Sequence, residues 1–180
     1  RGVQVTVATR ATQPEDSNTL WAQGGIIFRG DVDSPQALAD DILRAGAGHS
    51  YPKAVRILAE EGPAALQRIL LDRVKVGFDR EAGGDLSLAL EGGHSIPRIV
   101  HVADHTGKAI ELALVRALTA HPNISLLTSH TAVDLLTPSH HSLDRLAVYE
   151  PRSCVGAYLF DQQSGRVRTC LARETILATG

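Results

Sequence analysis

Hydrophobic and polar residues alternate at the start of the chain. Residues 2–9 place apolar and β-branched side chains at alternate positions, which predicts a strand. Residues 10–18 are mostly polar and contain Pro14, which indicates a loop, and the apolar run 26–28 predicts a second, short strand. The chain therefore begins with two strands separated by a polar loop.

Apolar residues at helical spacing dominate the next part of the chain. A helix start is indicated where a capping residue precedes proline, as in Asp33-Ser34-Pro35. Four helices are expected: from Pro35 until Gly46 and Gly48, from Pro52, from Gly62-Pro63 until residues 76–79, and over 106–119.

After the fourth helix the pattern changes to strand-like runs. They cover residues 124–128, 131–137, 145–150, 155–161 and 166–178, with a turn at 162–165. The chain thus has one strand, then a helical block, then a series of strands. This order is typical of an α/β nucleotide-binding domain whose crossover region carries an antiparallel β-meander. This is the fold class that we predict.

Composition excludes several classes of partner. The 180 residues include 18 Lys and Arg against 20 Asp and Glu, a net charge of −2, so the basic surplus of a nucleic-acid binder is missing. No apolar run approaches the roughly 20 residues of a membrane span, and residues 1–9 do not resemble a signal peptide. We expect one cytoplasmic domain with neither nucleic acid nor membrane as partner.

A metal site is not expected. Cys154 and Cys170 are too far apart for a CxxC motif, so we interpret them as buried, reduced thiols. His140-His141 has no Cys or carboxylate at ligand spacing.

The chain also begins at Arg1 and contains no Met, so we expect an internal piece of a longer protein, the alternative being a trimmed domain.

Two loops contain residues suited to binding. In the first, Gly24-Gly25 lets backbone N–H groups approach a ligand, and the hydroxyls of Ser17 and Thr19 suit phosphate or ribose oxygens; the alternative is a simple turn. In the second, residues 91–95 place a carboxylate and an imidazole three residues apart, which suits an ammonium, a carboxylate or a proton transfer; the alternative is a solvated loop. Trp21, in the first loop, is expected in the core.

Two further segments could approach a ligand. Asp104 or Thr106 is expected to cap the helix over 106–119, whose free N–H groups favour anions. Gly107 in its first turn permits either close packing or the close approach of a ligand. Residues 174–180 form an apolar run that ends in small residues, which suits either a cofactor-lining strand or any buried strand.

Taken together and in this order, these segments resemble the L-aspartate oxidase family over essentially the whole chain. The matching segments are Asn18-Thr19-x-x-Ala22-Gln23-Gly24-Gly25-Ile26, Glu91-Gly92-Gly93-His94-Ser95, Arg98-Ile99-x-His101-x-x-Asp104-x-Thr106-Gly107, Thr131-Ala132-Val133-Asp134-Leu135 and Ala178-Thr179-Gly180. The resemblance implies a partial Rossmann-like FAD-binding domain over residues 1–180, with a helical insertion and the β-meander. Its GxGxxG turn would precede residue 1, and its capping and catalytic regions would follow Gly180.

The resemblance also implies an activity. The family oxidises L-aspartate to iminoaspartate with FAD, which passes electrons to oxygen or fumarate, and the product feeds quinolinate and NAD synthesis; quinolinate synthase would be a partner. Glu91 would orient the substrate ammonium group, as the catalytic residue, and His94 would also contact substrate. The residues implied in cofactor binding are Arg10, Asn18, Thr19, Ala22, Gln23, Gly24, Gly25, Thr131, Ala132, Ala178, Thr179 and Gly180.

Two alternatives remain open. The chain is also similar to succinate dehydrogenase and fumarate reductase flavoproteins, which act on dicarboxylates without an amino group and would differ by preferring succinate or by attaching flavin covalently to a histidine. A non-catalytic remnant would share the fold without the chemistry. If the chain is a piece of an L-aspartate oxidase, we expect the isolated chain to bind FAD weakly and to be inactive.

Overall fold

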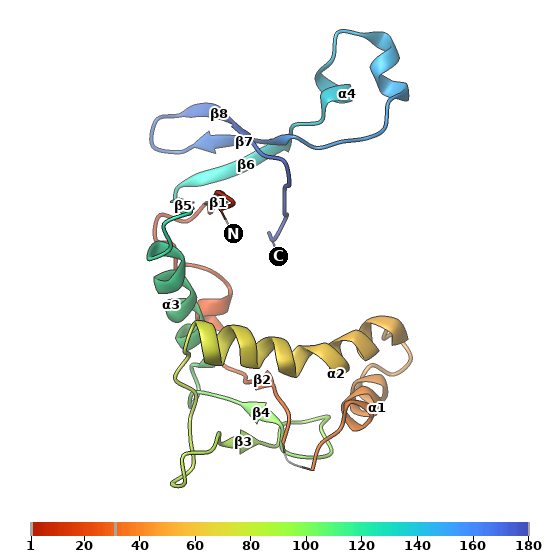
Figure 1. The fold of residues 1–180 in the computed structure, drawn as a ribbon, viewed down its shortest axis with the longest axis vertical. Coiled ribbons are helices and arrows are strands. Elements are labelled where there is room, and N and C mark those ends of the chain that lie inside the picture. Colours follow the sequence, from red (N-terminus) through yellow and green to blue (C-terminus); the bar gives the residue numbers. More distant parts are fainter. Residues whose placement is uncertain (1, 31, 180) are drawn as a thin grey trace. The chain divides into compact units, whose positions relative to one another are not determined.

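The computed structural model describes residues 2–30 and 32–179, which form two compact units (Figure 1). The strand unit combines the N-terminal segment, up to Asp16, with the segment from His121 onwards. The helical unit comprises Ser17–Ala120. No helix in the described residues has the length and apolar character required to cross a membrane.

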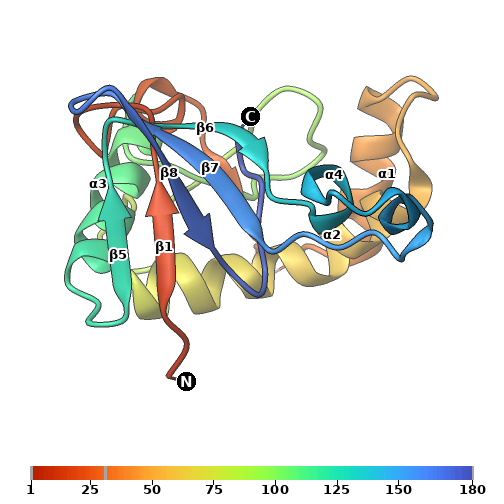
Figure 2. The same cartoon turned by 90° about the horizontal axis from the view of Figure 1, so that it is seen from above.

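The strand unit contains two small sheets. β1 (Val5–Ala8) runs parallel to β5 (Ile124–Leu127), with Val5 opposite Ile124 (Figure 2). β6 (His130–Leu135), β7 (Gly156–Asp161) and β8 (Arg166–Leu171) form an antiparallel sheet in that order. The predicted first strand and β-meander are therefore confirmed.

The Asp161 carboxylate organises the predicted turn at residues 162–165. It accepts hydrogen bonds from the Gln163 N–H at 3.0 Å, the Ser164 N–H at 3.2 Å and the Ser164 hydroxyl at 2.7 Å. These bonds lower the pKa of Asp161, the Ser164 hydroxyl having the largest effect, although burial of the side chain acts to raise it. The side chain at the end of β7 thus sets the reversal into β8.

Two predicted strands in this unit are wrong. Residues 145–150 form the 3-10 helix η3 (Arg145–Tyr149), which follows α4 (Pro138–His141). The Asp144 carboxylate accepts from the Leu146 N–H at 2.9 Å and so caps a helical turn, because a short polar side chain competes with strand pairing. The run 166–178 is a strand only to Leu171.

The helical unit begins with η1 (Thr19–Trp21) and contains α1 (Pro35–Ala45), where the Ser34 hydroxyl accepts from the Ala37 N–H at 3.1 Å as expected. The last helix, α3 (Thr106–Thr119), has the predicted bounds.

Trp21 is 74% exposed, so its predicted place in the core is wrong. Its 3-10 helix buries no residue, which explains the exposure.

The predicted second and third helices are one element. α2 (Pro52–Leu66) passes through Pro63 and continues as the π-helical segment η2 (Gln67–Arg73). Pro63 has no N–H to donate to the Ala59 carbonyl four residues earlier, which normally disfavours a continuous helix. Here Arg29 Nη2 donates to that carbonyl at 3.0 Å, so the freed acceptor is satisfied.

A small antiparallel sheet contains the short strand predicted at residues 26–28, which is confirmed, and two strands that the sequence does not predict. β2 (Ile26–Ile27) pairs with β4 (Ile99–Val100), which pairs with β3 (Leu88–Ala89). β3 lies within a Gly-rich stretch, and strands of two residues have no readable periodicity.

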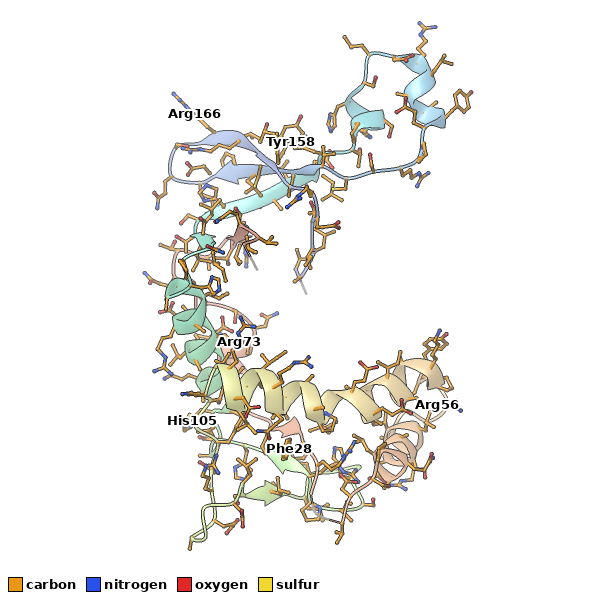
Figure 3. The ribbon with its side chains drawn as sticks, viewed as in Figure 1. Phe28, Arg56, Arg73, His105, Tyr158 and Arg166 are labelled. Carbon is orange, nitrogen blue, oxygen red and sulfur yellow. The ribbon has the colours of Figure 1, made fainter. Side chains whose placement is uncertain are left out.

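Two apolar clusters support the helical unit. One contains Leu66, Leu70, Val76, Phe78, Val100 and Ala113, and the other contains Leu38, Ala39, Val55 and Ala59. Phe28, labelled in Figure 3, follows β2 and packs against the first cluster. α2 and its π segment contribute to both clusters.

Candidate functional site

The small sheet brings together the two loops that sequence analysis selected. Gly25 directly precedes β2, and Glu91 lies in the loop between β3 and β4. The Gly25 N–H donates to Glu91 Oε1 at 3.2 Å. The order β2-β4-β3 therefore joins the predicted flavin loop to the predicted substrate carboxylate.

Gly25 has no room for a side chain. A Cβ at this position would lie 2.2 Å from Ile99 Cγ2 and 2.6 Å from the Val100 carbonyl oxygen. It would also lie 3.3 Å from Glu91 Oε1. Glycine at this position therefore allows both the β2–β4 pairing and the contact with Glu91.

Gly107 performs a similar role at the start of α3. Its N–H donates to the Ala22 carbonyl at 2.9 Å, and a Cβ would lie 2.1 Å from the Thr19 carbonyl oxygen. The predicted close packing at Gly107 is confirmed. The Gly107 N–H is not free to bind an anion, because it already donates to the Ala22 carbonyl at the end of η1.

The predicted cap of α3 is wrong. The N-cap residue is His105, labelled in Figure 3, and its side chain makes no capping bond. The Thr106 hydroxyl accepts from the preceding Val102 N–H at 3.0 Å. Asp104 lies 3.2 Å from His105 Nδ1, a contact that lowers the pKa of Asp104.

A buried ion cluster lies beside the loop 91–95. Arg98 is fully buried, and its Nε and Nη2 donate to the two carboxylate oxygens of Asp33 at 2.8 and 2.9 Å. Its Nη1 donates to Asp41 Oδ2 at 2.5 Å and contacts His94 Nδ1 at 3.0 Å. Arg44 binds the other oxygen of Asp41.

Asp41 also holds the loop directly. Both the N–H and the hydroxyl of Ser95 donate to Asp41 Oδ2 at 2.8 Å. Burial alone would raise the pKa of Asp41, but the bonds from Ser95, Arg98 and Arg44 hold it well below its usual value of 3.8. Burial alone would lower the pKa of Arg98, but the hydrogen bonds and negative charges of Asp33 and Asp41 raise it above its usual value.

Sequence reasoning missed Asp33 and Asp41 as members of a site. Asp33 was read only as part of a helix start. Asp41 lies three residues after Leu38 and one before Ile42, so it interrupts the apolar stripe of α1. A charged residue on an apolar helix face was the available signal, because such a residue needs a buried partner.

Asp41 makes stability depend on pH. Its pKa is lower in the folded chain, so its stabilising effect is fully present above the unfolded pKa and is lost as pH falls from about 4 towards the folded pKa. We expect Asp41→Asn to reduce the slope of stability against pH below about pH 4. Urea unfolding at a series of pH values measures the slope, and an unchanged slope would contradict this assignment.

The residues around η1 are suited to a cofactor. The Ser17 hydroxyl oxygen is buried and has no hydrogen-bond partner among the described residues, while Asn18, Thr19, Gln23 and Gly24 are exposed. Phosphate or ribose oxygens of a dinucleotide would supply the missing partner. A hollow of about 300 Å³ beside η1 is lined by Leu20, Trp21, Ala22, Gln23, Asp104, His105 and Lys108.

In the strand unit, one unanticipated side chain connects two predicted cofactor residues. Gln162 Nε2 donates to the Arg10 carbonyl at 3.0 Å and to the Thr131 hydroxyl at 2.9 Å. Ala132 lies on β6 opposite Leu159. Gln162 was read only as a turn residue, and nothing in its local sequence indicated this bridge.

The remaining predicted residues are not joined to these contacts. Ala178 and Thr179 belong to the strand unit, beyond β8 and outside regular structure. Gly180 lies outside the described residues.

The cysteines are free but only partly buried, so their predicted burial is wrong. The Cys154 thiol is exposed to solvent in part and donates to the Gly156 carbonyl at 3.3 Å.

His140 and His141 lie on α4 with ring centroids 5.2 Å apart. Within the described part of the chain, no three His, Cys, Asp or Glu residues gather at a metal-binding distance.

Comparison with known proteins identifies the family of the chain. The family described as FAD binding domain matches residues 1–180. L-aspartate oxidase 1 of Ralstonia nicotianae is 40% identical over 178 residues, covering 98% of this chain and 32% of the relative. L-aspartate oxidase of Halobacterium salinarum is 39% identical over 182 residues, covering 99% of this chain and 33% of the relative. The chain thus spans about a third of the length of these curated relatives.

Solved structures agree with the predicted fold class. A variant of Escherichia coli quinol fumarate reductase gives a TM-score of 0.84 at 20% identity, covering 99% of this chain and 28% of that chain. The apo Sdh1 complex of Mycobacterium smegmatis gives 0.83 at 23% identity, covering 99% and 30%. These likenesses confirm the mixed α/β fold, and the family match confirms FAD as the expected cofactor. Matched along its whole length, this chain belongs to the family of FAD binding domains.

Proposed function

We propose that this chain is part of an L-aspartate oxidase, which converts L-aspartate to iminoaspartate. Two curated relatives of that name, at 39 and 40% identity over nearly the whole chain, support the proposal. Residues 1–180 would be a partial FAD-binding domain, completed by segments outside this sequence. FAD, when bound, supplies the acceptor for the hydride from the substrate α-carbon, with oxygen or fumarate as the final electron acceptor.

The bond between the Gly25 N–H and Glu91 Oε1 is the observation on which the proposal depends. The Glu91 carboxylate is exposed, so its second oxygen is available to a ligand. A carboxylate is the natural partner of the aspartate ammonium group. Glu91 would therefore orient the ammonium group while it is held beside the flavin loop.

We assign the remaining roles by unit. In the helical unit His94 would contact substrate, and the cofactor would lie along Asn18, Thr19, Ala22, Gln23, Gly24 and Gly25. The unpartnered Ser17 hydroxyl supports this assignment. In the strand unit the adenosine part would meet Arg10, Thr131 and Ala132, and Ala178, Thr179 and Gly180 would also line the cofactor. The Gln162 bridge supports a shared role for Arg10 and Thr131.

The proposed reaction also implies a cellular context. Iminoaspartate would feed quinolinate and hence NAD synthesis in the cytoplasm, with quinolinate synthase as the consuming partner. A fumarate reductase or succinate dehydrogenase flavoprotein is the alternative that shares this fold.

Glu91→Gln in the full-length flavoenzyme tests the proposal. Loss of a charge-assisted hydrogen bond is expected to raise the KM for L-aspartate by about 10- to 100-fold, because such bonds contribute about 1.5–3 kcal/mol. Steady-state assays with aspartate and with succinate measure the effect.

Glu81→Gln is the matched control, since Glu81 is an exposed glutamate in another loop of the same unit. It should leave the KM unchanged. Oxidation of succinate in preference to aspartate by the unmodified enzyme, with flavin attached covalently, would support the alternative and exclude the proposed activity.

A further inference from the structure

The contact between Arg98 and His94 determines which ring nitrogen carries the proton. An arginine side chain has hydrogen-bond donors and no acceptor. Arg98 Nη1 lies 3.0 Å from His94 Nδ1, so Nδ1 must be the acceptor. The ring is then neutral, and its single proton is on Nε2.

The geometry leaves Arg98 little freedom to give up this bond. Four of its hydrogen-bond interactions are fixed: two with Asp33, one with Asp41 and one with His94. The guanidinium is fully buried and planar, so rotating it away from His94 would also break its bonds to both carboxylates.

The loop residues on either side of His94 are held as well. The backbone N–H and hydroxyl of Ser95 both donate to Asp41. On the other side, Arg44 Nη2 lies 3.5 Å from the Gly93 carbonyl oxygen. The His94 ring is therefore fixed at its backbone and at Nδ1, while Nε2 has no partner among the described residues.

The loop thus presents two complementary groups. Glu91 accepts hydrogen bonds, and His94 offers a donor at Nε2. An amino dicarboxylate has one ammonium group that needs an acceptor and two carboxylates that need donors. We propose that Arg98 is a positioning residue that holds His94 in the Nε2–H form, so that His94 donates a hydrogen bond to a substrate carboxylate. This inference rests on the proposed dicarboxylate substrate and assigns His94 and Glu91 to different groups of it.

The tautomer can be measured independently of catalysis. In the full-length flavoprotein labelled with ¹⁵N-histidine, the His94 signals are identified by their loss in His94→Gln. We expect an unprotonated Nδ1 and a protonated Nε2 in the unmodified protein, and a mixture of tautomers in Arg98→Lys, because lysine lacks the planar fork. A protonated Nδ1 in the unmodified protein, or an unchanged tautomer in Arg98→Lys, would overturn the proposal.

Ligand binding separates the two roles. The test ligands are L-aspartate and succinate, which lacks the ammonium group, and the readout is the flavin absorbance change on titration. His94→Asn and Arg98→Lys are expected to weaken both ligands by about tenfold. Glu91→Gln is expected to weaken aspartate alone. His94→Gln retains an amide donor near the Nε2 position, so it should restore most of the affinity, also when combined with Arg98→Lys.

Controls distinguish positioning from simple damage to the fold. Arg80→Lys makes the same substitution at an arginine whose side chain, within the described residues, bonds the Gly84 carbonyl alone, so both affinities should stay unchanged. Loss of affinity in Arg98→Lys that His94→Gln does not restore would show a structural role only and would overturn the proposal. If the protein binds succinate and shows the expected tautomer but does not oxidise aspartate, the proposed activity fails while the positioning role stands.

Discussion

Replacing Asp41 by alanine is expected to lower the free energy of unfolding by about 3–5 kcal/mol. Removing one partner of a buried ion cluster leaves the other charge without compensation, and that cost is in this range. Arg98 would keep Asp33 but lose Asp41, while Ser95 would lose the acceptor of its N–H and hydroxyl. Urea unfolding of the purified protein, followed by circular dichroism, measures the change.

Asp40→Ala is the matched control for this substitution. Asp40 is the neighbouring acid on α1, but it is exposed, and among the residues that the structure describes its carboxylate bonds the Gln36 side-chain amide alone. Exposed substitutions of this kind usually change stability by less than about 0.5 kcal/mol. Equal effects of the two variants would contradict a special role for the buried cluster.

Gly107→Ala is expected to destabilise the protein by about 1–3 kcal/mol, although glycine to alanine within a helix normally stabilises it. The new Cβ would lie 2.1 Å from the Thr19 carbonyl oxygen and 2.6 Å from the Ala22 carbonyl oxygen. Both are backbone atoms, so η1 must move as a whole. We also expect weaker retention of FAD, measured by the flavin content of the purified full-length protein.

Gly62→Ala is the matched control for this substitution. Gly62 lies within α2, and beyond its neighbours in the chain its added Cβ would meet only the Leu58 side chain, at 3.3 Å. Leu58 is 48% exposed and can move aside. The helix propensity of alanine favours this variant by up to about 1 kcal/mol, but the new Cβ also meets the ring of the following Pro63, so the net change should be small compared with that of Gly107→Ala. A stabilised Gly107→Ala would show that η1 does not constrain the helix start.

Elements with long, regular patterns were predictable from sequence. α1 and α3 have capping signals or apolar stripes, and the β-meander has long alternating runs. The errors have tertiary causes. Pro63 predicts a break in the helix, because proline leaves a carbonyl four residues earlier without its donor. The donor that replaces it belongs to Arg29, which is 34 residues away in the sequence and therefore outside any local pattern. The two-residue strands β3 and β4 exist through pairing and carry no local signal.

The site was predictable in its motifs but not in its connections. The loops containing Gly25 and Glu91 were selected, and their contact depends on the pairing of β2 with β4. Asp33 and Asp41 are 65 and 57 residues from Arg98, so no local pattern could join them. The sequence predicts Trp21 in the core, whereas η1 exposes it.

The helix that runs through Pro63 has a consequence for how the helical unit unfolds. Val55 and Ala59 belong to one apolar cluster, while Leu66 and Leu70, further along the same rod, belong to the other. Unwinding at the N-terminal end of this helix therefore loosens one cluster, and unwinding at its C-terminal end loosens the other. The two clusters are thus coupled through one continuous backbone and should open as a single cooperative unit.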